Sequence, residues 1–121
     1  MGLNIYFYDK DGNELEDTPH LQITHNLNTL VAACGEMKGI AYYEAVWRPD
    51  EMFECKNGEV PVIMVLPYLV NLLHDLICYE HILEKHIPEN GWGTYEGLIN
   101  FVCNYIRACY KAKDWYIYCC R

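Results

Sequence analysis

The sequence predicts an α+β fold in which a small antiparallel sheet of two or three strands, including both termini, packs against three or four helices. Three observations lead to this prediction. Short runs rich in β-branched and aromatic residues stand at both ends of the chain. Apolar residues recur at helical spacing between them. The chain has 121 residues, 52% of them apolar, which suits one core, so we expect residues 1–121 to form a single domain.

Strands are expected at the two ends of the chain. Leu3–Tyr8 and Trp115–Cys119 have the composition of strands, and a polar turn over residues 9–13 ends the first. Because a lone strand is unstable in water, these two should pair with each other or with a third strand. The segment Leu21–Thr24 alternates apolar and polar residues and is the candidate for that third strand.

Two helices are expected in the first half of the chain. The first begins near residues 24–26, with Thr24 or Asn26 as its cap, and ends at Gly35 or Gly39. Its apolar face is formed by Leu27, Leu30, Val31 and Cys34. The second covers residues 40–47 and ends before Pro49, because the residue before a proline disfavours helical geometry.

Two longer helices are expected in the second half. Pro67 suits the first position of one, and its apolar stripe continues to Ile87. Residues 88–93 then form a loop, and Thr94 caps the last helix. The apolar stripe of that helix consists of Tyr95, Leu98, Ile99, Val102, Tyr105, Ile106 and Cys109.

The charge of the chain excludes several classes of partner. Seventeen acidic residues against nine basic ones give a net charge of −8, which opposes binding to nucleic acid and to anionic membranes. A basic protein partner remains compatible with it. We find no export signal, and the seven cysteines show no CxxC spacing. We therefore expect reduced thiols and a cytoplasmic location, in the cytoplasm of a bacterial host once the resemblance below is considered.

Metal and enzyme chemistry find little support in the sequence. His74, Cys78 and His81 are spaced to share one helix face, but zinc needs a fourth ligand and none is apparent, so we predict no metal and no cofactor. For an enzyme, His25 would be the acid or base and Arg48 would stabilise charge. No complete catalytic constellation accompanies them, and the enzyme hypothesis ranks last.

Three short polar and aromatic segments exceed what folding requires. Two contain helix starts, whose free N–H groups favour anions, and the third contains an arginine, whose fork of donors suits phosphate. If the three segments meet, they would bind a nucleotide or another planar anion. The predicted ligand-binding residues are Thr24, His25, Asn26, Trp47, Arg48, Asn90, Trp92, Thr94 and Tyr95. The alternative is that these residues are only caps, core anchors, a turn and a surface ion pair.

The same segments resemble a family of small proteins encoded by bacteriophages and prophages. The motifs are ITHNL at 23–27, YYEAVWRP at 42–49 and PENGWGTYEGLINFV at 88–102. Pro67, Cys109 and Arg121 match further positions, whereas Cys120 replaces a serine and the stretch between residues 30 and 43 is longer than usual. The resemblance implies a phage product acting in a bacterial cytoplasm, and it implies no settled biochemical activity.

Two functional hypotheses follow besides the enzyme. The first is a phage-type accessory protein that binds a small anionic, nucleotide-like ligand and so sequesters a host defence signal. The second is an inhibitor that uses an acidic, Tyr-rich surface to bind a host defence protein. Self-association is a further expectation, because five tyrosines exceed what one small core takes up, namely Tyr42, Tyr43, Tyr110, Tyr116 and Tyr118.

Overall fold

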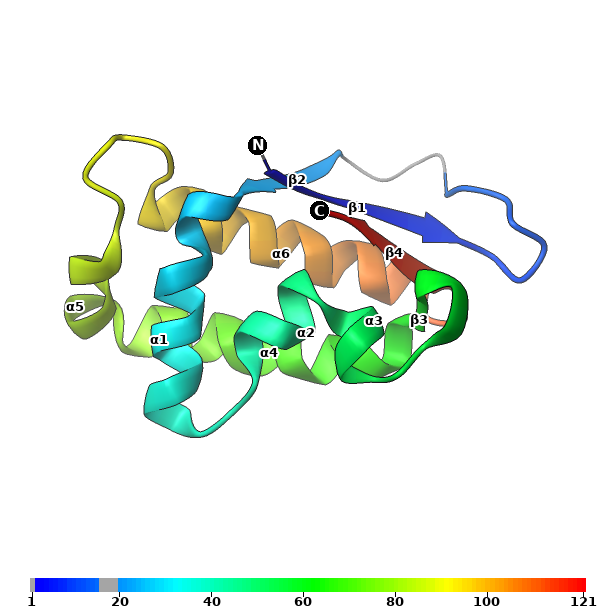
Figure 1. Cartoon of the computed structure of the whole chain (residues 1–121), viewed down its shortest axis with the longest axis horizontal. Coiled ribbons are helices and arrows are strands. Elements are labelled where there is room, and N and C mark those ends of the chain that lie inside the picture. The colour runs from blue at the N-terminus through cyan, green and yellow to red at the C-terminus, as the bar shows by residue number, and fades with distance from the viewer. Residues whose placement is uncertain (1, 16–19) are drawn as a thin grey trace.

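The computed structural model describes residues 2–15 and 20–121, and it places an antiparallel sheet on one side of a helical layer (Figure 1). The strands are β1 (Gly2–Tyr8), β2 (Leu21–Thr24), β3 (Glu59–Pro61) and β4 (Tyr116–Cys120). The helices are α1 (Asn28–Lys38), α2 (Tyr42–Trp47), α3 (Pro49–Met52), α4 (Val62–Cys78), α5 (Glu80–Leu83) and α6 (Tyr95–Lys111). Three short 3-10 helices are η1 (His25–Leu27), η2 (Lys56–Gly58) and η3 (Glu84–His86). The predicted α+β class is confirmed.

The sheet joins the two ends of the chain, as predicted. Its strand order is β2-β1-β4-β3, and each neighbouring pair is antiparallel. The expected third strand is β2, but the predicted count of two or three strands was too low, because β3 completes a sheet of four. That strand has three residues and ends in a proline, which leaves too little alternation for a sequence pattern to show.

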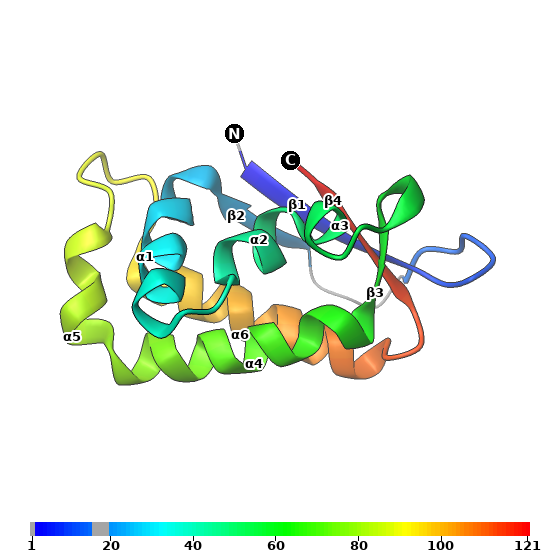
Figure 2. The same ribbon diagram turned by 60° about the horizontal axis from the view of Figure 1, so that its bottom comes forward.

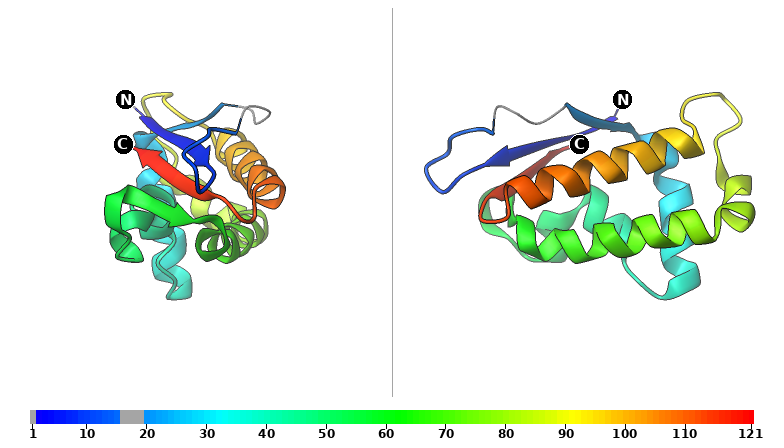
Figure 3. Two further views of the ribbon diagram at one scale, coloured as in Figure 1. Left: turned by 90° about the vertical axis from the view of Figure 1, so that its right-hand side faces the viewer. Right: turned by 180° about the vertical axis from the view of Figure 1, so that it is seen from behind.

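The two faces of the sheet differ in composition. Along β1 the buried residues Leu3, Ile5 and Phe7 alternate with Tyr6 and Tyr8, which lie on the opposite face. The helices pack against the first face in all the views (Figures 1 and 3). The second face, which carries the tyrosines, has no helix over it among the described residues.

The helices of the first half follow the prediction with small changes. The expected apolar face of α1 is buried, and Gly39, in the left-handed region at φ 69°, ends this helix, so Gly35 lies inside it. Pro49 follows α2 as expected, but it also opens a further turn, α3 (Figure 2). A proline at the first helical position costs no backbone hydrogen bond, which allows both roles.

The long helix differs from the prediction at both ends. It begins at Val62, directly after Pro61, so the prediction that Pro67 opens it was wrong, and Pro67 lies exposed within the helix. It ends at Cys78 instead of continuing toward Ile87, because Tyr79 leaves helical geometry at ψ 22°. Cys78, the last residue of this helix, is exposed. All seven cysteines are free.

The second half of the chain forms a pair of adjacent long helices. α4 and α6 lie side by side, and the chain reverses between them through α5, η3 and a loop (Figure 3). Residues from both helices enter the core, including Leu72, Leu76, Leu98 and Tyr105. Within residues 2–15 and 20–121, no single helix has the length and apolar composition to cross a membrane; α4 with residues 80–86, bent by 81°, meets the two criteria only as a pair.

Candidate functional site

Two of the three predicted segments meet at one end of the sheet. A hollow of about 630 Å³ lies between the turn after β2 and the loop before α6, which are neighbours in Figure 1. Its lining residues are Gly2, Gln22, Ile23, Thr24, Asn26, Asn90, Trp92 and Gly97. Four of the nine predicted ligand-binding residues are in this set: Thr24, Asn26, Asn90 and Trp92.

The turn after β2 is held by the Thr24 side chain. Its Oγ1 accepts hydrogen bonds from the backbone N–H of Asn26 at 3.3 Å and from Asn26 Nδ2 at 3.2 Å. Thr24 is therefore the cap of η1, as predicted, although the helix it starts is a 3-10 turn that leads into α1. Asn26 is exposed, and the bond from its Nδ2 to Thr24 holds the side-chain amide at the edge of the hollow.

The loop before α6 presents an exposed indole. Asn90 Oδ1 accepts a hydrogen bond from the backbone N–H of Trp92 at 2.9 Å, which fixes the turn. The Trp92 side chain remains outside this bond, and the residue is 66% exposed. Thr94 Oγ1 accepts from the Gly97 N–H at 2.9 Å and so caps α6 as predicted. Thr94 is thereby engaged in the cap and does not line the hollow.

Gly93 is the point at which the two segments touch. Its φ of +126° is rarely adopted by residues with a side chain. A Cβ atom here would lie 2.9 Å from Leu27 Cγ and 3.0 Å from Thr24 Cγ2, closer than carbon atoms pack. The glycine therefore permits the loop to lie directly on the turn and brings the lining residues of both segments together.

Trp47 is a core anchor and lies outside the hollow. It is 2% exposed, stacks on Tyr43 with ring centroids 5.7 Å apart, and donates its Nε1–H to His25 Nδ1 at 2.9 Å. This bond joins the second motif to the first and occupies one nitrogen of His25. Neither Trp47 nor His25 lines the hollow.

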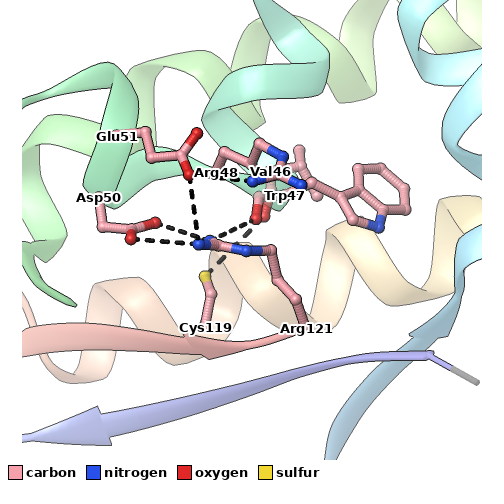
Figure 4. A network of polar contacts seen from close by, with 7 residues as sticks. All are labelled: Val46, Trp47, Arg48, Asp50, Glu51, Cys119 and Arg121. Atoms are coloured by element: carbon pink, nitrogen blue, oxygen red, sulfur yellow. Dashed lines mark hydrogen bonds and ion pairs between the residues drawn. The ribbon is translucent and has the colours of Figure 1, made fainter.

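The arginine of the second motif belongs to a network of ion pairs (Figure 4). Arg48 Nη1 lies 2.9 Å from Glu51 Oε1. Arg121 Nη1 donates to Asp50 Oδ1 at 2.7 Å and to the Trp47 carbonyl at 3.1 Å, and Nη2 donates to Asp50 Oδ2 at 3.3 Å. The Arg121 guanidinium lowers the pKa of Asp50. These charges tie β4 to the junction of α2 and α3, and Arg48 is not among the lining residues.

Tyr95 lies in the core and does not line the hollow. It is buried, and its hydroxyl donates to the Leu76 carbonyl at 2.6 Å, which links the start of α6 to α4. Burial raises the pKa of this phenol. Five of the nine predicted residues therefore position the hollow or lie apart from it: His25, Trp47, Arg48, Thr94 and Tyr95.

The lining determines which chemistry the hollow can perform. Within the part of the chain that the structure describes, no Lys or Arg lines it; the amides of Gln22, Asn26 and Asn90 and one indole do. Amides bind the edges of polar rings and an exposed indole stacks on their faces. Sequence reasoning missed Gln22 as a site residue. Gln22 lies between the buried Leu21 and Ile23 in the strand, so the alternation places it on the outer face of the sheet. Among the residues that the structure describes, no group of three His, Cys, Asp or Glu side chains could hold a metal ion.

Comparisons with protein-family models, with curated proteins and with solved structures found no match to this chain. The resemblance to phage proteins therefore stays a prediction. His25 and Arg48, the pair named for an enzyme, do not share a hollow, so this geometry adds no support for the enzyme hypothesis.

Proposed function

We propose that this protein binds a small nucleotide-like ligand in the hollow at the end of the sheet, and that it acts as a phage-type accessory protein by withholding such a signal from host defence. One observation carries the proposal: Thr24 and Asn26 line the same hollow as Asn90 and Trp92. The two segments lie far apart in sequence and are joined at Gly93. The conjunction of amides and an exposed indole suits a planar, polar ring.

The lining favours recognition of the ring over recognition of a phosphate. Arg48 is paired with Glu51, and the amides supply uncharged donors and acceptors. The chain as a whole carries a charge of −8, which repels an anion. We therefore expect a nucleoside to bind about as tightly as the corresponding nucleotide, so that the anionic group contributes little to the free energy of binding.

A thermal-shift screen with nucleosides and with linear and cyclic nucleotides tests the proposal. At about 100 times Kd, a ligand stabilises the folded state by about 2.7 kcal/mol, which raises Tm by several degrees. Trp92→Ala should abolish this shift, because the stacking surface is lost. Since Trp92 is 66% exposed, the same change should alter the stability of the free protein by less than about 1 kcal/mol.

Arg48→Met is the matched control for this screen. It changes a charged residue of a neighbouring motif that does not line the hollow, so the ligand-induced shift should persist. No shift with any of these compounds at millimolar concentration would contradict the proposal. A shift that survives Trp92→Ala would also contradict it.

A second candidate function, binding of a host defence protein, is favoured by the outer face of the sheet. Tyr6 lies opposite Tyr118 and Tyr8 opposite Tyr116, so four tyrosines share the face without helices. A hollow of about 310 Å³ beside them is lined by Tyr8, Gly12, Asn57, Glu59 and Tyr118. Aromatic rings next to a carboxylate suit a basic side chain, so the partner would present Lys or Arg.

Selection from a displayed peptide library tests this candidate. We expect enrichment of peptides with Lys or Arg, and at least a fivefold loss of binding for Tyr118→Ser or Glu59→Gln, a change of about 1 kcal/mol. Tyr110→Ser, at an exposed tyrosine of α6, is the control and should bind as the unchanged protein does. Recovery of peptides without basic residues, or equal binding by all variants, would rule this surface out.

A further inference from the structure

A second cluster of reactive side chains lies on α4, apart from the hollow. Cys78 Sγ is 3.6 Å from His74 Nε2, and His74 Nδ1 is 3.2 Å from Asp75 Oδ1. The other carboxylate oxygen, Oδ2, accepts a hydrogen bond from the Tyr42 hydroxyl at 2.5 Å. The four groups form a continuous chain of contacts from an exposed thiol to a buried phenol.

The buried carboxylate of Asp75 lies between Tyr42 and His74 in this series of contacts. Asp75 is 4% exposed, and it is the charged residue that the described part of the chain buries. A buried charge is costly unless a cation or donors compensate it. Tyr42 supplies a neutral donor, because burial and the Asp75 carboxylate raise the pKa of this phenol. His74 is the group in contact with Asp75 that can become a cation.

Two other titratable groups, Cys34 and Lys38, lie near Asp75 and interact with its charge. Cys34 on α1 is buried, and burial with the nearby Asp75 charge raises its pKa to about 11, which keeps it a neutral thiol. Lys38 Nζ bonds to the Tyr79 hydroxyl at 3.4 Å and lies over that ring. His74 Nδ1 lies against the Asp75 carboxylate while Nε2 faces Cys78 Sγ, so His74 is placed to accept the proton of that thiol.

We propose that Cys78 is a nucleophilic thiol that exchanges with small uncharged or cationic disulfides, with His74 as its proton acceptor and Asp75 as a positioning residue. The chain charge of −8 disfavours anionic disulfides. The proposal is independent of ligand binding in the hollow, which none of these residues lines.

The reaction is an ordinary thiol–disulfide exchange. His74 Nε2 takes the proton of Cys78, and the thiolate attacks one sulfur of the small disulfide. The disulfide bond of the small molecule breaks as the new bond to Cys78 forms. The leaving thiolate takes the proton back from His74, so one small thiol is released for each Cys78 that is modified.

The chain provides an internal control thiol. Cys120 is exposed like Cys78, but no described histidine contacts it. Cys34 and Cys109 are buried, and burial raises the pKa of Cys119 to about 12, so these three thiols should react slowly. The comparison of Cys78 with Cys120 therefore separates activation from simple exposure.

The test measures the modification rate of each cysteine in the folded protein with 2-hydroxyethyl disulfide, by mass spectrometry of quenched samples. At pH 7 we expect Cys78 to react about tenfold faster than Cys120. His74→Gln should bring the two rates within about twofold, because glutamine cannot accept the proton. His81→Gln, at an exposed histidine of α5, should leave the Cys78 rate unchanged.

The role of Asp75 is read from a pH profile. Asp75→Asn should move the pH at which the Cys78 rate is half-maximal upward, toward that of Cys120, in a protein whose circular dichroism shows it is folded. Should that variant not fold, His74→Gln decides alone, since the His74 side chain is 71% exposed. Equal rates for Cys78 and Cys120 in the unchanged protein, or an unchanged Cys78 rate in His74→Gln, would overturn the proposal.

Discussion

Gly93→Ala should lower the free energy of unfolding by about 2–6 kcal/mol and abolish ligand binding in the hollow. Two costs add at this position. A side chain at φ +126° strains the backbone by about 1–3 kcal/mol, and the new methyl group has no room beside Leu27 and Thr24, which adds about 1–3 kcal/mol. The loop must then move away from the turn, and Asn90 and Trp92 move with it. Chemical denaturation and the thermal-shift screen measure the two effects.

Gly91→Ala is the matched control. Gly91 has φ +78°, but nothing lies within 4 Å of a Cβ placed there. This change carries the cost of backbone strain alone, about 1 kcal/mol, and the loop should stay on the turn. If Gly93→Ala costs no more than Gly91→Ala, the two segments do not pack as described. If it costs more but the ligand still binds, the hollow is not the binding site.

Tyr42→Phe should destabilise the protein by about 3 kcal/mol. The change removes the 2.5 Å hydrogen bond to Asp75 Oδ2 and leaves a buried carboxylate short of a donor. Removing one partner of a charged group in the protein interior costs about 3–5 kcal/mol of stability. Asp75 keeps its contact with His74, which reduces this cost. Urea denaturation at pH 7 measures the difference in the free energy of unfolding.

Tyr95→Phe serves as the comparison, because it removes the same atom at a similarly buried site. The Tyr95 hydroxyl donates to the neutral Leu76 carbonyl, and such bonds contribute about 1 kcal/mol. Adding Asp75→Asn to Tyr42→Phe should recover part of the loss, because the buried charge is gone. Equal costs for the two phenylalanine variants would show that the Asp75 charge plays no special part in stability.

Much of the fold could be predicted from local patterns. The terminal strands, the buried face of α1 and the stripe of α6 follow from alternation or from helical spacing, which few residues suffice to reveal. The break at Tyr79 could not be predicted, because the apolar spacing continues past it and no glycine or proline marks it. Tertiary contacts, among them the bond from Lys38 to Tyr79, accompany this break.

Only part of the candidate site could be predicted from the sequence, because local patterns reveal helix caps but not contacts between distant segments. Caps such as Thr24 and Thr94 act on N–H groups two or three residues away, so the sequence identifies them. Whether two loops meet depends on contacts between distant residues. The one signal was Gly93, whose need for close approach is visible only once Leu27 and Thr24 lie beside it. From the sequence we predicted that Arg48 binds an anion, because nothing in the sequence distinguishes its partner, Glu51, from other charged surface residues.

The order β2-β1-β4-β3 has a consequence for how the chain folds during synthesis. β1 is made first and β4 last, yet β4 lies between β1 and β3 in the finished sheet. On the ribosome, β1 and β2 can form a hairpin early, but β3 has no neighbour in the sheet until residues 116–120 leave the exit tunnel. The contacts of highest sequence separation, those between β1 and β4, therefore close last.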